Sequence, residues 1–80
     1  LLEDQSGIAR VYGNLGNLHF RQGDYKSAKS YFTQSIEISR SISEIPNAQI
    51  VAHLGLTHMN QGNYDEAIRC QQEQLELSRH

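Results

Sequence analysis

The sequence predicts an all-α fold: a fragment of an α-solenoid, made of two tandem helix-turn-helix units with four helices. The first observation is an internal repeat, because residues 9–40 match residues 48–79 at a constant offset of 39. The second is apolar side chains at helical spacing, and the third is a glycine turn, at Gly23 and at Gly62, in the middle of each unit. Stacked helical repeats usually form binding surfaces and not catalytic pockets. The identical pairs include Ala9/Ala48, Leu15/Leu54, Gly16/Gly55, His19/His58, Tyr25/Tyr64 and Ala28/Ala67.

The repeat divides the chain into four segments. We expect 1–7 to be the end of a preceding repeat or an N-terminal linker, 8–41 the first unit, 42–46 a linker and 47–80 the second unit. Two units are fewer than the three or so that a solenoid normally needs for a continuous core. We therefore expect either a piece of a longer array or a chain completed by self-association.

The first unit is expected to be two helices joined by a tight turn. Gly23 can take the left-handed conformation that ends a helix, and Asp24 can cap the next one. The second helix is expected from about Tyr25 to about Ser41. The predicted apolar face of the first helix contains Ile8, Val11, Tyr12, Leu15, Leu18 and His19. The predicted inward face of the second contains Ala28, Phe32, Ser35, Ile36 and Ser39.

The second unit repeats this arrangement. Pro46 suits the first turn of a helix, where its missing N–H costs nothing, and Asn63 with Glu66 forms a pattern like a capping box. The predicted apolar face of its first helix contains Val51, Leu54, Gly55 and His58. The last helix is expected to turn Ala67, Ile68, Gln71, Leu75 and Ser78 towards its neighbour. Small residues suit close helix crossings, so we expect Gly16 and Gly55 to face Ala28 and Ala67.

Composition excludes several classes of function. The net charge is −2 and the basic residues are scattered, so no basic stripe suggests nucleic acid. No apolar run approaches the length of a membrane span, and a single Cys70 excludes an internal disulfide and favours a cytoplasmic protein. His53 and His58 are five residues apart and not four, so they do not form a helical metal motif. We expect no enzyme, no catalytic residues, no metal and no cofactor.

Several short segments resemble the tetratricopeptide repeat family. They are Leu15-Gly16-Asn17, Gln22-Gly23-Asp24-Tyr25 and Ala28 in the first unit, and Leu54-Gly55 and 61–68 in the second. The 39-residue spacing is longer than the usual 34, and Arg40 and Arg79 stand where a proline commonly closes the repeat. The segments 35–40 and 74–79 resemble the long-period subclass found in LGN/Pins-type spindle-orientation scaffolds.

The resemblance implies a protein-interaction scaffold whose first helices line a concave face that holds a peptide of a partner protein. For the subclass it implies an adaptor in cell polarity or spindle orientation. A clamp for a C-terminal carboxylate is not expected, because Gly13 and Ala52 stand where such clamps need a lysine. The peptide-binding residues implied by the resemblance are Arg10, Asn14, Asn17, Arg21, His53, Leu56 and Asn60.

The residue chemistry suits that role. Asn14 and Asn17 are three residues apart, so both amides can point into one groove and grip a peptide backbone. Arg10 and Arg21 can pair with acidic side chains.

Two alternatives remain open. The segment can be structural or self-associating, without a ligand, in which case another chain covers Ile8 and Val11 at one end and Leu75 and Leu77 at the other. It can also be a regulatory segment attached to an enzyme.

Overall fold

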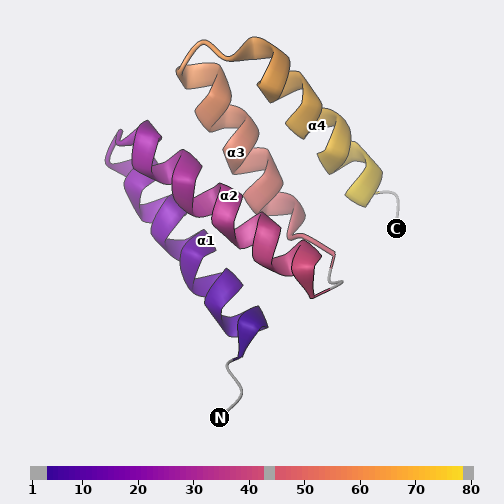
Figure 1. Ribbon diagram of the computed structural model, residues 1–80. Coiled ribbons are helices and arrows are strands. Elements are labelled where there is room, and N and C mark those ends of the chain that lie inside the picture. The colour runs from indigo at the N-terminus through magenta and orange to yellow at the C-terminus, as the bar shows by residue number, and fades with distance from the viewer. Residues whose placement is uncertain (1–3, 43–44, 79–80) are drawn as a thin grey trace.

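The computed structural model describes residues 4–42 and 45–78, and this part of the chain forms four α-helices. They are α1 (Gln5–Arg21), α2 (Tyr25–Ser41), α3 (Ala48–Asn60) and α4 (Tyr64–Ser78). The helices lie in a row as two antiparallel hairpins, with α1 and α4 at opposite edges (Figure 1). The prediction of an all-α fold with two tandem helix-turn-helix units is confirmed. Part of the predicted linker 42–46 and the predicted inward placement of the Ser78 side chain lie outside the described residues.

Both hairpins close through the same glycine turn. Gly23 and Gly62 each have a φ of 81°, which a glycine adopts without the penalty that a Cβ would bring. The backbone N–H of the residue after each glycine then bonds to the end of the preceding helix. The Asp24 N–H donates to the His19 carbonyl at 2.9 Å, and the Asn63 N–H donates to the His58 carbonyl at 2.8 Å. These bonds satisfy carbonyl groups that a helix end leaves unpaired. The predicted helix-ending role of both glycines is confirmed.

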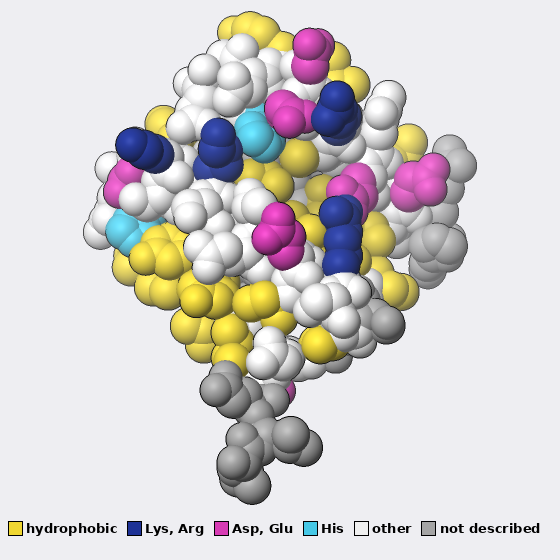
Figure 2. All heavy atoms as spheres, in the orientation of Figure 1, with side chains coloured by type: hydrophobic (Ala, Val, Ile, Leu, Met, Phe, Trp, Pro, Cys, Tyr) yellow, Lys and Arg dark blue, Asp and Glu magenta, His cyan; other side chains and the backbone are white. Residues whose placement is uncertain are grey.

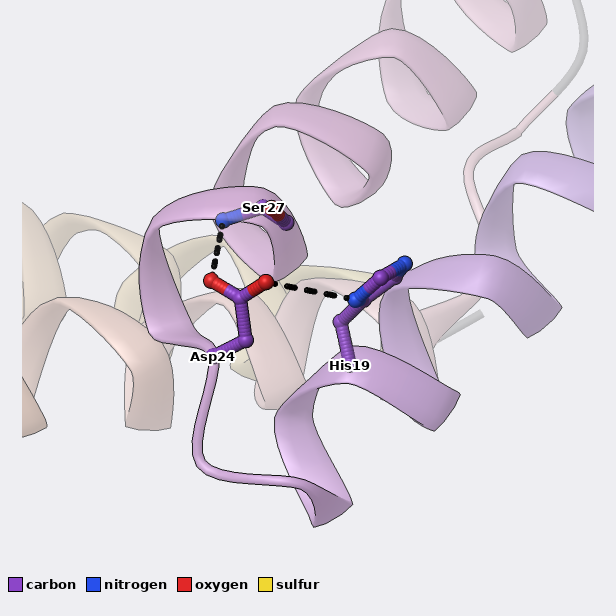
Figure 3. A network of polar contacts seen from close by, with 3 residues as sticks. All are labelled: His19, Asp24 and Ser27. Atoms are coloured by element: carbon purple, nitrogen blue, oxygen red, sulfur yellow. Dashed lines mark hydrogen bonds and ion pairs between the residues drawn. The ribbon is translucent and has the colours of Figure 1, made fainter.

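Aspartates cap the two helices of the first unit. The Asp24 carboxylate accepts a hydrogen bond from the Ser27 backbone N–H at 3.3 Å and lies 3.4 Å from the His19 Nδ1 (Figure 3). Hydrogen bonds from Ser27, with a smaller contribution from His19, hold the pKa of Asp24 below its ordinary value. Asp4 caps α1 by accepting from the Gly7 N–H at 3.0 Å, so the helix extends N-terminal of Ile8.

The two caps predicted for the second unit differ from the structure. Pro46 precedes α3 and is not in its first turn, because Asn47 is the N-cap and accepts from the Gln49 N–H at 2.8 Å. Asn63 does precede α4, but its N–H already donates to His58, and the Glu66 carboxylate pairs with Arg69 at 3.0 Å. The predicted capping box therefore does not form.

The core lies between α2 and α3. It consists of Ala28, Phe32 and Ile36 from α2 with Val51 and Leu54 from α3. α2 packs against α1 on its other side, so its inward residues are covered from two directions, and all five predicted for this helix are buried.

A hydrogen bond links α2 to α1 within the buried region. The Ser35 hydroxyl donates to the Ala9 carbonyl at 2.7 Å. Ser35 and Ala9 are both buried, which explains why a polar side chain is accommodated at this helix crossing.

The inward face predicted for α1 is partly wrong. Val11 and Leu18 are exposed, and the buried residues of α1 are Ala9, Gly13 and Gly16. Small side chains occupy the contact face because the helices approach closely there. Tyr12 and His19 of the predicted face do contact α2, since both rings stack on Tyr31, whereas Val11 and Leu18 remain uncovered.

The inward face predicted for α4 is also partly wrong. Ala67 is buried as expected, but Ile68 and Leu75 are exposed, as is Gln71. The side that packs on the core carries Cys70 and Leu77 instead. Among the described helices α4 packs mainly on α3, so its other apolar side has no cover. None of the described helices is long and apolar enough to cross a membrane.

The two helix-crossing glycines meet different neighbours. A Cβ on Gly16 would lie 2.7 Å from the Phe32 Cδ1, so the nearest neighbour of Gly16 on α2 is the Phe32 ring, one turn from the Ala28 that the sequence suggested. A Cβ on Gly55 would lie 3.1 Å from the Cys70 Cβ and 3.6 Å from the Ala67 carbonyl oxygen. Gly55 thus lies against the part of α4 that was predicted for it.

Candidate functional site

A cleft opens between α1 and α3, over the N-terminal part of α3. It has a volume of about 120 Å³. Arg10, Asn14 and Asn17 contribute from α1 and His53 from α3, so the structure brings together four of the seven predicted groove residues. The full lining is Arg10, Gly13, Asn14, Asn17, Phe32, Asn47, Gln49, Ile50 and His53.

A second hollow, of about 310 Å³, adjoins this cleft. It shares Arg10, Asn47 and Ile50 with the first hollow, so the two lie side by side. We call the two together the α1–α3 cleft. The second hollow is lined by Ser6, Ala9, Arg10, Ser35, Ser39, Ile45, Asn47 and Ile50. The resulting groove is elongated and open, which suits a chain segment better than a small enclosed ligand.

Gly13 and Ile50 set the floor of the α1–α3 cleft. A Cβ on Gly13 would lie only 2.5 Å from the Ile50 Cδ1, so the absence of a side chain lets Ile50 approach α1. Asn14 and Asn17 are about one turn apart on the same face of α1, so both reach this cleft. Gly13, which stands where a carboxylate clamp would need a lysine, therefore forms part of the floor of the cleft.

His53 forms an aromatic wall of the α1–α3 cleft. Its ring centroid lies 5.9 Å from that of Phe32 with an interplanar angle of 13°, and 5.8 Å from that of Phe20. Stacking on the buried Phe32 holds the imidazole in place. A ring fixed in this way offers an ordered surface to a ligand at little cost in side-chain entropy.

The polar lining of the α1–α3 cleft is amide-rich and carries a cation. Asn14, Asn17, Asn47 and Gln49 supply donors and acceptors, and among the described residues neither hollow is lined by an aspartate or a glutamate. Arg10 is exposed at the junction of the hollows and makes no ion pair within residues 4–42 and 45–78. This lining favours a ligand with backbone amides and a carboxylate.

Three predicted groove residues do not line the α1–α3 cleft. Arg21 and Asn60 are the last residues of α1 and α3, whereas the cleft lies over the N-terminal part of α3. The Asn60 side-chain N–H donates to the Leu56 carbonyl at 3.0 Å, so this amide is engaged within its own helix. Leu56 is exposed on α3 outside both hollows.

Sequence reasoning missed Asn47 and Ile50. The signal for Asn47 was available, because an asparagine directly before a helical pattern is a strong N-cap, and a cap residue lies at the helix entrance. Ile50 had no such signal: its place in the cleft depends on its contact with Gly13, which lies far away in the sequence.

His19, Asp24 and Ser27 form a polar cluster with the composition of a hydrolase triad (Figure 3). Its geometry is that of a helix cap, because Asp24 accepts from the backbone N–H of Ser27 and not from a hydroxyl held by an imidazole base. Burial, with a smaller contribution from Glu73, raises the pKa of the Cys70 thiol, which keeps it in the poorly nucleophilic protonated form.

The fold and the cleft together define a class: a helical-repeat protein in which paired helices stack and expose a groove lined by their first helices. Two sequence models of the tetratricopeptide repeat match the chain, over residues 9–41 and 48–80. The chain therefore belongs to the tetratricopeptide repeat family. Such repeats generally mediate protein–protein interaction, and proteins built from them are typically non-enzymatic scaffolds. No curated protein gives a significant match to the chain.

Proposed function

We propose that this chain is a protein-interaction module that binds an extended peptide segment of a partner protein in the α1–α3 cleft. The observation that carries the proposal is the convergence of Arg10, Asn14 and Asn17 with His53 on one open groove, whose described lining residues include no acid. The amides bind the peptide backbone, and Arg10 pairs with an aspartate or glutamate of the peptide. Ile50 and the His53 ring contact an apolar side chain beside it.

A narrower proposal concerns the biological setting. The 39-residue spacing and the segments 35–40 and 74–79 support an adaptor of the LGN/Pins type, active in cell polarity or spindle orientation. The family matches support the general repeat and not this subclass. We also propose a cytoplasmic location, supported by the single cysteine, whose pKa is raised and which has no disulfide partner within the chain.

The binding proposal can be tested with a phage-displayed library of random peptides. Selected sequences should be enriched in an acidic residue next to an apolar one, and a labelled copy of a selected peptide should bind the chain in a fluorescence-anisotropy titration. Arg10→Gln should weaken binding by about 10- to 100-fold, the range expected for loss of a charge-assisted hydrogen bond. The double variant Asn14→Ala/Asn17→Ala should weaken it further.

The chain supplies matched controls for this titration. Arg21→Gln removes the other arginine of α1, and Asn60→Ala removes an asparagine outside the α1–α3 cleft, so both should leave the affinity unchanged. A peptide whose affinity falls equally with Arg10→Gln and Arg21→Gln would contradict the proposed cleft. A library that yields no binder would contradict peptide binding by this chain.

A further inference from the structure

The joint between α2 and α3 shows how one repeat packs on the next. Phe32 and Ile36 of α2 pack against Val51 and Leu54 of α3, and all four are buried. Lys29 of α2 lies near enough to His58 of α3 for its charge to contribute to the lowered pKa of that imidazole. Because the chain repeats at an offset of 39, each residue of this joint has a counterpart at one edge of the molecule.

The counterparts of the α3 side of the joint lie on α1. Ile50, Val51, Leu54 and Thr57 correspond to Val11, Tyr12, Leu15 and Leu18. In α3, Thr57 is 0% exposed, whereas its counterpart Leu18 on α1 is 49% exposed. Val11, the counterpart of the half-buried Ile50, is 56% exposed. Val11 and Leu18 share one helical face with Ile8 and Leu15. We call these four residues the α1 stripe. Figure 2 shows hydrophobic side chains gathered at this edge of the molecule, over α1.

The counterparts of the α2 side of the joint lie on α4. Ile36 of the joint corresponds to Leu75, and Tyr25 and Lys29, which lie at helical spacing from Ile36 on α2, correspond to Tyr64 and Ile68. These three α4 residues share one helical face, which we call the α4 stripe, and they are 64%, 51% and 56% exposed. Ile36, by contrast, is 6% exposed. The molecule thus carries exposed apolar residues at positions equivalent to both sides of its internal joint, on the helices at its two opposite edges (Figure 1).

The charges of the two edge helices are opposite. α1 contains two arginines and no acidic residue, whereas α4 contains four acidic residues and one arginine. A contact between α1 and α4 therefore brings unlike charges together, and a contact between two copies of α1 or of α4 brings like charges together. Charge complementarity favours the head-to-tail arrangement over a symmetric pair.

We propose that a second copy of this chain docks head to tail, with the α4 stripe of one copy packed on the α1 stripe of the next in the geometry of the α2–α3 joint. Such a contact is heterologous and leaves one stripe of each kind free, so the assembly grows with concentration and does not stop at a dimer. The contact is weaker than the internal joint, because the counterpart of the buried Phe32 is Gln71. This contact is independent of the proposed peptide binding, since no residue of either stripe lines the α1–α3 cleft.

The test is sedimentation velocity on the 80-residue chain between about 10 μM and 1 mM, with circular dichroism as a check on helix content. The weight-average mass should rise with concentration, and should rise less in about 0.5 M salt than in about 0.05 M salt because the charges are screened. Val11→Glu and Leu75→Glu should each lower the association constant at least about tenfold, since each buries an unpaired carboxylate in the contact. Leu56→Glu, at an exposed apolar residue of α3 outside both stripes, is the matched control and should change nothing.

Mixing the two variants is the decisive measurement. Val11→Glu retains an intact α4 stripe and Leu75→Glu retains an intact α1 stripe, so an equimolar mixture should form a dimer and stop there. A parent chain that stays monomeric throughout would overturn the proposal. So would a mixture that fails to dimerise, or an association that Val11→Glu abolishes and Leu75→Glu leaves intact, because these results describe a different partner or a symmetric contact.

Discussion

Gly13 and Gly16 lie on the same helix, but an added side chain would meet a different kind of neighbour at each position. A Cβ on Gly16 would lie 2.7 Å from the Cδ1 and 2.8 Å from the Cε1 of Phe32, whose ring is fixed in the core at 1% exposure. A Cβ on Gly13 would meet the Ile50 Cδ1, the free end of a flexible side chain, at 2.5 Å. The first contact can be relieved only by moving a helix, the second by a change of rotamer.

We therefore predict that Gly16→Ala lowers the free energy of unfolding by about 1–3 kcal/mol, the usual cost of overpacking a core. Gly13→Ala should have a much smaller effect, because alanine gains up to about 1 kcal/mol over glycine inside a helix, which offsets the shift of Ile50. Urea unfolding followed by circular dichroism measures both. Equal losses for the two variants would show that Ile50 is as constrained as Phe32.

His58 gives the fold a dependence on pH near neutrality. Its Nδ1 is buried without a hydrogen-bond partner among the described residues, and burial, with a contribution from Lys29, lowers its pKa below the ordinary 6.5. The unfolded chain therefore binds a proton at a pH where the folded chain does not, so stability decreases as the pH falls from about 7 through the pKa of the folded state.

We predict that the urea midpoint of the parent chain falls between pH 7 and pH 5, and that His58→Phe removes most of this fall while keeping an aromatic ring at the site. Asp24 acts in a different window: its pKa is lowered from 3.8, so the stability it contributes is lost only below that value. If the urea midpoint of His58→Phe falls as much as that of the parent chain, the pH dependence belongs to other groups.

At the scale of elements, both turns depend on a glycine with a positive φ. Gly62 has a φ of 81° and no atom within 4 Å of the position of a Cβ, so a substitution there changes backbone strain and not packing. We predict that Gly62→Ala destabilises the chain by about 1–2 kcal/mol, the cost of the left-handed conformation for a residue with a Cβ. Gly62→Asn should cost less, because asparagine tolerates that conformation. Thermal unfolding of the two variants checks this prediction. If the size of the new side chain and not backbone strain set the cost, Gly62→Asn would be the less stable of the two.

Helix existence, turn positions and the inward face of α2 could be predicted from the sequence. α2 is covered by α1 and α3, so every apolar position that the periodicity identifies finds a neighbour. The same reasoning failed for Ile68 and Leu75 on α4, and for Val11 on α1. Periodicity shows that a helix has an apolar face, but whether a neighbour covers that face depends on which elements surround it. The errors therefore fall on the two helices at the edges of the row.

The α1–α3 cleft was predictable in part for a related reason. Arg10, Asn14 and Asn17 were expected from the resemblance to the tetratricopeptide repeat, and their spacing along one helix lets them reach one cleft. Arg21 and Asn60 were expected on the same ground, but the cleft does not extend along the whole of α1 and α3, and its extent depends on how closely Gly13 and Ile50 approach. Contacts between residues far apart in sequence carry that information, and a single sequence does not contain it.

At the scale of the whole molecule, Phe32 contacts both repeats. Its ring lies against Gly16 of α1, stacks on His53 of α3, and belongs to the cluster that holds Val51 and Leu54. A chain of 80 residues has a total stability of roughly 4–12 kcal/mol. Removing a buried phenylalanine ring costs about 3–5 kcal/mol, a large part of that total.

We predict that Phe32→Ala unfolds both repeats together and not the first alone, because each repeat loses part of the same buried cluster. The repeat itself supplies the control: Gln71 is the counterpart of Phe32 in the second unit and is exposed, so Gln71→Ala should change stability by no more than about 0.5 kcal/mol. Hydrogen exchange of the Phe32→Ala chain checks the prediction, since protection should fall by the same factor in α1 and α2 as in α3 and α4. Protection that survives in α3 and α4 would mean that the second repeat folds by itself and that the Phe32 cluster is not shared.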